Sequence, residues 1–119
     1  MKELIGKLRN FVDQRDWAKF HSPKNLAMAL SVETAEIVEH FQWLTQEQSY
    51  KLDPDKLAKV NDEIGDVFIY LTMLADKLGL DPLQAALDKI EKNEKNYPAS
   101  LVRGKSKKYM EYQSPAIRK

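Results

Sequence analysis

The chain has 119 residues, no cysteine, a net charge of +1 at pH 7, and 43% hydrophobic against 31% charged residues. Such a length suits one domain with a single core, and the composition is typical of a globular protein rather than a disordered one. Disulfides and cysteine-ligated metals are excluded. Because no apolar run approaches the ~18 residues that span a bilayer, and no signal-peptide core follows Met1, we expect a cytoplasmic protein without a membrane segment.

Three predicted helices begin with the same kind of residue pair. Ser22-Pro23, Asp53-Pro54 and Asp81-Pro82 each pair an N-cap residue with proline at the first helical position. Gly79 and Pro98 stand where helices end, and no segment alternates with period two. We predict an all-α, four-helix bundle-like fold in one domain over residues 1–112, with a tail over 113–119. The four helices are expected over residues 2–20, 23–45, 54–78 and 82–96.

Two acids of the second predicted helix lie on or beside its apolar side. Glu33 falls in the gap between Leu30 and Ile37 of the apolar stripe, and Glu36 borders the stripe one turn along. Glu39 turns towards solvent. Glu33 is therefore expected to face the core.

The third predicted helix repeats this arrangement. Glu63 falls in the stripe between Val60 and Val67, and Asp66 follows three residues later. The stripe continues towards the end of this helix through Leu71, Leu74 and Leu78. A further likeness is that His40 follows Glu33, and Tyr70 follows Glu63, by seven residues. Two equivalent helices would then present two pairs of acids to one space.

Four inward carboxylates need a counter-charge. At about 5 Å, each ionised pair repels by roughly 3 kcal/mol at an effective dielectric near 20. Protonation, buried ion pairs or a metal would relieve this repulsion, and the scarcity of bases near the stripes favours a metal. Oxygen ligands indicate Mg²⁺, with Mn²⁺ as a substitute. A di-iron site is excluded because it needs Glu-x-x-His on two helices.

The acids stand in the spacing E-x-x-E, 26 residues, E-x-x-D, among the segments RDWAKFHSPKNLAMAL, EHFQW, DEIGDVFIYL and K-x-x-x-N-x-x-x-YP. This pattern resembles the all-α, MazG-like nucleoside triphosphate pyrophosphohydrolases, in their dCTP pyrophosphatase branch, over roughly residues 4–112. The resemblance implies Mg²⁺-dependent hydrolysis of a deoxynucleoside triphosphate, dCTP or a modified dCTP, to the monophosphate and pyrophosphate. It also implies a dimer or tetramer.

The resemblance further implies roles for particular residues. The metal ligands would be Glu33, Glu36, Glu63 and Asp66, and Glu36 is our candidate for orienting or deprotonating the attacking water. Base stacking would fall to Trp17 and Trp43, with His21 and Tyr70 as secondary contacts. Lys89 and Asn93 would bind phosphate oxygens. The spacing alone leaves core tryptophans and a solvated polar face for Lys89 and Asn93 as alternatives.

Charge is unevenly distributed along the chain. Residues 33–66 hold nine acids and three lysines, whereas residues 99–119 hold six bases and one acid. These segments either attract one another, or the acids bind cations and the bases bind an anionic ligand that accompanies those cations. Nucleic acid is not an expected partner, since the net charge is near zero. The alternative function is a non-catalytic helical module that senses nucleotides or binds a protein.

Overall fold

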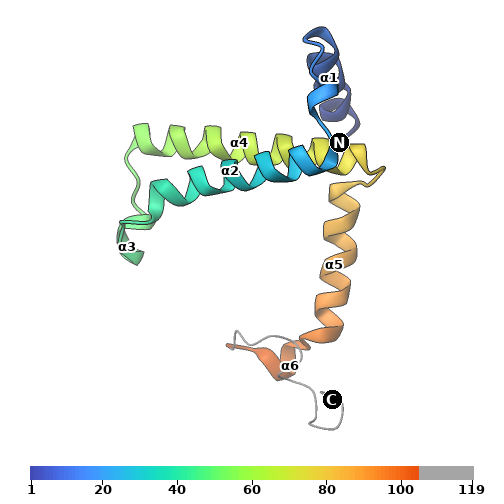
Figure 1. Cartoon of the computed structure of the whole chain (residues 1–119). Coiled ribbons are helices and arrows are strands. Elements are labelled where there is room, and N and C mark those ends of the chain that lie inside the picture. The colour runs from blue at the N-terminus through green and yellow to red at the C-terminus, as the bar shows by residue number, and fades with distance from the viewer. Residues whose placement is uncertain (105–119) are drawn as a thin grey trace. The chain divides into compact units, whose positions relative to one another are not determined.

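The computed structural model describes residues 1–104, so the predicted tail over 113–119 lies outside the described residues. All regular structure in the described residues is helical, which confirms the predicted all-α class (Figure 1). The chain forms two compact units, Met1–Pro82 and a second that begins at Leu83. The elements in chain order are α1 (Lys2–Gln14), the 3-10 helix η1 (Ala18–Phe20), α2 (Pro23–Phe41), α3 (Gln46–Ser49), α4 (Pro54–Lys77), α5 (Pro82–Asn96) and α6 (Ala99–Val102).

The first helix ends earlier than predicted, at Gln14. Asp16 adopts a left-handed conformation with φ 53°, which an aspartate tolerates better than most residues. The Asp16 N–H donates to the Asp13 carbonyl at 3.1 Å and the Trp17 N–H to the Val12 carbonyl at 3.1 Å. This is the hydrogen-bond pattern of a Schellman termination, usually built on glycine. The predicted single helix over residues 2–20 is therefore wrong, and η1 replaces its last turn.

The predicted starts of the next two long helices are confirmed. The Ser22 hydroxyl accepts from the Asn25 N–H at 3.1 Å to begin α2, and the Asp53 carboxylate accepts from the Lys56 N–H at 2.8 Å to begin α4. Each cap satisfies one of the N–H groups that a helix start leaves without a partner. The end of α2 was predicted at residue 45, but Thr45 instead caps the short helix α3 in a capping box.

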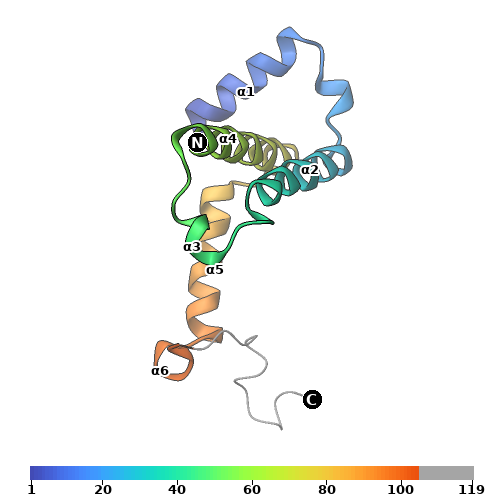
Figure 2. The same cartoon turned by 90° about the vertical axis from the view of Figure 1, so that its left-hand side faces the viewer.

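Helices α2 and α4 run antiparallel and pack together, and α1 also contacts α4 (Figures 1 and 2). The residues buried in this unit are Val12, Leu26, Val60, Thr72 and Ala75. The predicted stripe of α4 is wrong at Leu71 and Leu78, which are exposed, whereas Leu74 between them is half-buried. There α1 joins α2 against α4, and the buried side of α4 is the one that carries Thr72 and Ala75.

The outer sides of this helix pair remain apolar. Large hydrophobic side chains on α2 and α4 are 40% to 59% exposed, namely Met28, Val32, Val38, Ile64 and Phe68. So many exposed apolar side chains on a small unit are typical of a surface that another chain covers.

The second unit contains α5 from Leu83 onward and the short helix α6. The bounds of α5 agree with the predicted helix over residues 82–96. Leu83, Leu87 and Ile90 form an apolar stripe on α5 and are 50% to 58% exposed. Within residues 1–104, no helix is long and apolar enough to cross a membrane.

Candidate metal centre

Three carboxylates meet between α2 and α4. One oxygen of each of Glu33, Glu36 and Glu63 lies within 4.8 Å of the others, and all three side chains are half-buried. Residues three apart share a helix face, so α2 presents Glu33 and Glu36 together, and the antiparallel α4 brings Glu63 opposite them. The structure thus joins three of the four predicted ligands, and we call them the carboxylate cluster.

Like charges and burial change the acidity of this cluster. Burial, a hydrogen bond with Glu36, and the charges of Glu36 and Asp66 raise the pKa of Glu33. A hydrogen bond with Glu36 is also the largest cause that raises the pKa of Glu63 to about 7, followed by burial and by the charges of Glu36, Glu33 and Asp66. A hydrogen bond between two carboxyl groups requires a proton on one of them. Without a cation, Glu33 and Glu63 therefore hold their protons to higher pH than ordinary glutamates do.

Two oxygens of the cluster are left without a partner. Oε2 of Glu33 and Oε2 of Glu63 are buried and accept no hydrogen bond within the described part of the chain. A buried acceptor without a donor is costly, and a bound cation would satisfy it. The ion pairs found in residues 1–104 join Lys7 to Glu3, Arg9 to Asp76 and Lys19 to Asp16. None of them includes Glu33 or Glu63, so the alternative of buried ion pairs at these glutamates gains no support. The residues present fit a hard divalent cation.

Asp66 stands beside the cluster rather than in it. Its side chain is exposed on α4, and it is not one of the three residues whose oxygens lie within 4.8 Å of one another. Its charge nevertheless contributes to the raised pKa of both Glu33 and Glu63. Its role as a fourth ligand stays a prediction.

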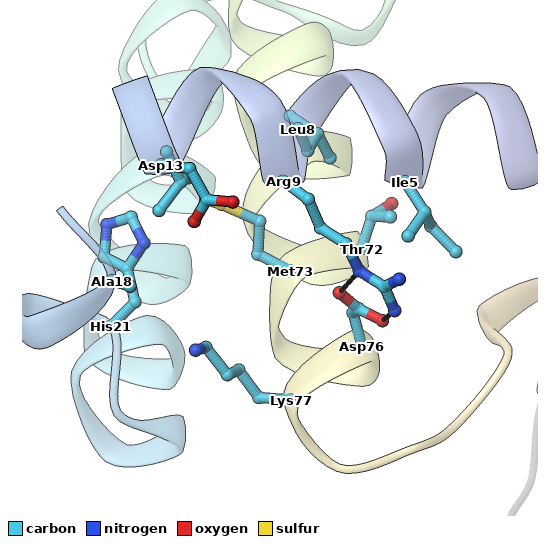
Figure 3. A pocket seen from close by; sticks show the side chains of 11 residues that line it. Ile5, Leu8, Arg9, Asp13, Ala18, His21, Thr72, Met73, Asp76 and Lys77 are labelled. Carbon is cyan, nitrogen blue, oxygen red and sulfur yellow. Dashed lines mark hydrogen bonds and ion pairs between the residues drawn. The ribbon is translucent and has the colours of Figure 1, made fainter. Parts of the chain in front are cut away.

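A pocket of about 360 Å³ lies further along α4, between α1, the segment before α2 and the last turns of α4 (Figure 3). Figure 3 shows His21, Asp13 and Lys77 on one side of it and the Arg9–Asp76 ion pair on the other. The Arg9 guanidinium donates to both Asp76 oxygens, at 2.9 and 2.6 Å. The volume suits a small ligand or part of one.

The pocket and the carboxylate cluster share α4. Thr72, which lines the pocket, follows Asp66 by six residues, or about 9 Å of helix rise. The Thr72 hydroxyl is fully buried and has no hydrogen-bond partner in the described chain. Of the predicted substrate contacts, only His21 lines this pocket.

The other predicted substrate contacts lie on the surface or near it. Trp17 is 44% exposed and packs edge-on against Phe11, with ring centres 5.7 Å apart. Trp43 is 87% exposed, two residues after the end of α2, so it is not a core residue of this chain. Tyr70 is half-buried on α4. In the second unit, Lys89 and Asn93 are exposed on α5.

One contact that the sequence reasoning missed joins the same two helices as the cluster. The Lys56 ammonium lies 3.3 Å from Nδ1 of His40. The seven-residue interval from Glu33 to His40 was a sequence signal for a shared face, but no pattern paired His40 with Lys56.

Fold and cluster together define an all-α protein with an acidic site between two antiparallel helices. Residues 28–111 match the model of the MazG-like family, and the chain belongs to that family. It is 40% identical to dCTP pyrophosphatase 1 of Homo sapiens over 109 residues, 90% of this chain and 64% of the relative. It is also 40% identical to dCTP pyrophosphatase 1 of Bos taurus over 101 residues, 83% of this chain and 60% of the relative.

A solved structure gives a second likeness. The chain resembles a pyrophosphatase from Archaeoglobus fulgidus with a TM-score of 0.78 and 43% identity, over 82% of this chain and 92% of that one. The chain spans about three fifths of the length of the two curated relatives.

Proposed function

We propose that the chain is a Mg²⁺-dependent nucleoside triphosphate pyrophosphohydrolase that converts dCTP, or a modified dCTP, to the monophosphate and pyrophosphate. In the cell it would remove such nucleotides from the cytoplasmic pool. The observation that carries this proposal is the carboxylate cluster, with its two buried oxygens that lack partners. The names of the similar proteins support the substrate class.

Glu33, Glu36 and Glu63, with Asp66 beside them, would hold the cation. A bound divalent cation would polarise the reacting phosphate and neutralise the charge of the leaving pyrophosphate. Glu36 has an oxygen within 4.8 Å of oxygens of both Glu33 and Glu63, and it contributes to the raised pKa of both. In our proposal, its carboxylate orients the attacking water and accepts the proton of that water.

The pocket that contains His21 is our candidate for the nucleoside end of the substrate. The pocket lies about 9 Å along α4 from Asp66, so a nucleotide bound in it could extend its phosphates to the carboxylate cluster. The exposed ring of Trp17, close in sequence to His21, is free to stack on a base, with Tyr70 as a further contact. Trp43 follows the opposite end of α2, so it would stack on a base bound by a second copy of the chain. Lys89 and Asn93, four residues apart on α5, would donate to phosphate oxygens.

We also propose that the chain associates with further copies of itself as a dimer or tetramer. The exposed apolar side chains of α2 and α4 support this, because obligate interfaces between like chains are apolar. Neither nucleic acid nor a membrane is a proposed partner. Sedimentation would report the mass, and a monomer at micromolar concentration would contradict the proposal.

The direct test of the activity is to incubate the chain with dCTP and MgCl₂ and separate the products by anion exchange. We expect dCMP and pyrophosphate in equal amounts. Release of orthophosphate, or no turnover with any deoxynucleoside triphosphate, would contradict the proposal. Turnover would also exclude the alternative of a non-catalytic module. A comparison of dCTP, 5-methyl-dCTP, dUTP, dTTP and dATP would then identify the preferred base.

A further inference from the structure

The contact between Lys56 and His40 lies on the same face of the helix pair as the carboxylate cluster. His40 follows Glu36 by four residues on α2, about 6 Å of rise, and Lys56 precedes Glu63 by seven residues on α4, about 10 Å. Intervals of four and seven residues return to nearly the same side of a helix. The cluster and the Lys56–His40 pair therefore follow one another along the face that α2 and α4 share.

The groups that this pair can offer to a third partner are hydrogen-bond donors. A lysine ammonium has three N–H groups and no acceptor, so in its 3.3 Å contact with Nδ1 of His40 the ammonium must donate. Nδ1 then accepts, and in the tautomer that matches this contact the ring N–H is on Nε2, where it is a donor too. Two ammonium N–H groups and one imidazole N–H remain for another partner. A group with several acceptors, such as a phosphate, matches this set.

No ion pair within the described residues gives Lys56 a negative partner. Lys56 is half-buried. The Asp53 carboxylate accepts a hydrogen bond from the backbone N–H of Lys56, which leaves the ammonium uninvolved. Lys56 also lies in the first turn of α4, where the helix dipole adds positive potential. A half-buried cation in this position favours an anion.

We propose that Lys56 and His40 form a subsite for the terminal phosphates of a polyphosphate whose reacting phosphate lies at the carboxylate cluster. This inference rests on the proposed function and extends it to the orientation of the substrate. The nucleoside end then points along α4 towards the His21 pocket, and the leaving pyrophosphate towards the start of α4. Lys56 is a binding residue in this arrangement, and His40 orients its ammonium and adds one donor.

The test measures binding and not turnover. Inorganic pyrophosphate is titrated calorimetrically, in the presence of MgCl₂, into the wild type, Lys56→Met and the control Lys59→Met. Lys59 is exposed on α4 three residues away. We expect Lys56→Met to weaken pyrophosphate binding about tenfold and the control by less than about twofold, since a charge-assisted hydrogen bond is lost only in the former. His40→Phe, which keeps a ring but removes both nitrogens, should weaken binding about threefold.

Three results would overturn the subsite: pyrophosphate affinity that is equal in Lys56→Met and the wild type, no binding of pyrophosphate by the wild type, or weaker binding of Mg²⁺ alone in Lys56→Met. The last would mean that the substitution disrupts the carboxylate cluster. Failure of the proposed reaction is a separate result. A wild type that binds pyrophosphate through Lys56 but leaves dCTP intact would retain the subsite and lose the activity.

Discussion

Two carboxylates on α4, Glu63 and Asp76, are only thirteen residues apart and have opposite environments. The Arg9 guanidinium, which donates two hydrogen bonds to Asp76, lowers the pKa of that carboxyl. A hydrogen bond with Glu36, burial and the charges of neighbouring acids raise the pKa of Glu63 to about 7. Helix α4 therefore carries Asp76, which forms an ion pair with Arg9, and Glu63, for which the described residues provide no ion pair. Burial does not explain this difference, since both side chains are half-buried; the charge of the neighbouring groups does.

The largest expected effect is the loss of catalysis when the carboxylate cluster is changed. Glu36→Gln should reduce dCTP turnover by about 10²–10⁴-fold, as expected when a general base or a ligand is removed, while the helical circular dichroism is unchanged. The matched control is Glu39→Gln, on the exposed side of the same helix. Asp66→Asn should reduce turnover by a similar factor. Full activity in either Glu36→Gln or Asp66→Asn would remove that residue from the mechanism.

The second largest effect should be on cation binding, which should depend on Glu63 and not on Asp76. A cation that binds only the folded chain adds about 2.7 kcal/mol to the free energy of unfolding at a hundredfold excess over its Kd. Thermal unfolding with and without MgCl₂ should show this gain in the wild type and in Asp76→Asn. In Glu33→Gln or Glu63→Gln the gain should fall sharply. A gain of equal size in all four proteins would mean that the cation binds elsewhere.

The pH dependence of stability should have opposite signs at the two acids. Because the pKa of Glu63 is raised from its ordinary 4.5 to about 7, the folded chain binds more protons than the unfolded chain between these values. Its contribution to stability therefore falls as pH rises from about 4.5 to 7. Asp76, with a lowered pKa, contributes stability at higher pH that is lost as the medium becomes acid.

Urea unfolding in EDTA at pH 5 and pH 7.5 measures the Glu63 effect. The comparison of wild type with Glu63→Gln isolates it, and we expect the fall in stability towards pH 7.5 to be smaller in the variant. A wild type that gains more stability than Glu63→Gln over this range would reverse the assignment.

The smallest effect should be the change in stability when the Arg9–Asp76 ion pair is removed. Asp76→Asn removes one charge from an ion pair whose guanidinium is exposed, and exposed pairs contribute little. We expect the unfolding midpoint to fall by a few degrees at most, and less in high salt than at low ionic strength. A large, salt-independent fall would show that the link between α1 and α4 matters more than its exposure indicates.

Local signals were sufficient to predict much of this fold. Ser22, Asp53 and Pro82 mark helix starts because caps and prolines act on the nearest turn, and Gly79, with φ 68°, ends α4 as expected. The break at Asp16 was missed because the residue that adopts the left-handed conformation is not a glycine.

Periodicity placed Glu33, Glu36 and Glu63 on inward faces, since each needs only the geometry of its own helix. The exposed Leu71 was missed because the buried side of α4 there depends on α1, a partner distant in sequence. Contacts between helices were the hardest to foresee. The pairing of Lys56 with His40 requires the register of α2 against α4, which no single-helix pattern contains.

The exposed ring at the end of α2 provides an optical probe. The chain has two tryptophans, and Trp43 is 87% exposed. Its fluorescence should be red-shifted in the free chain, and a base stacked on it, or a second copy that covers it, should change its intensity or shift its emission to the blue. Trp17→Phe would leave Trp43 as the one emitter. A single titration with dCMP, followed by dilution of the protein, could then separate nucleotide binding from self-association by light alone.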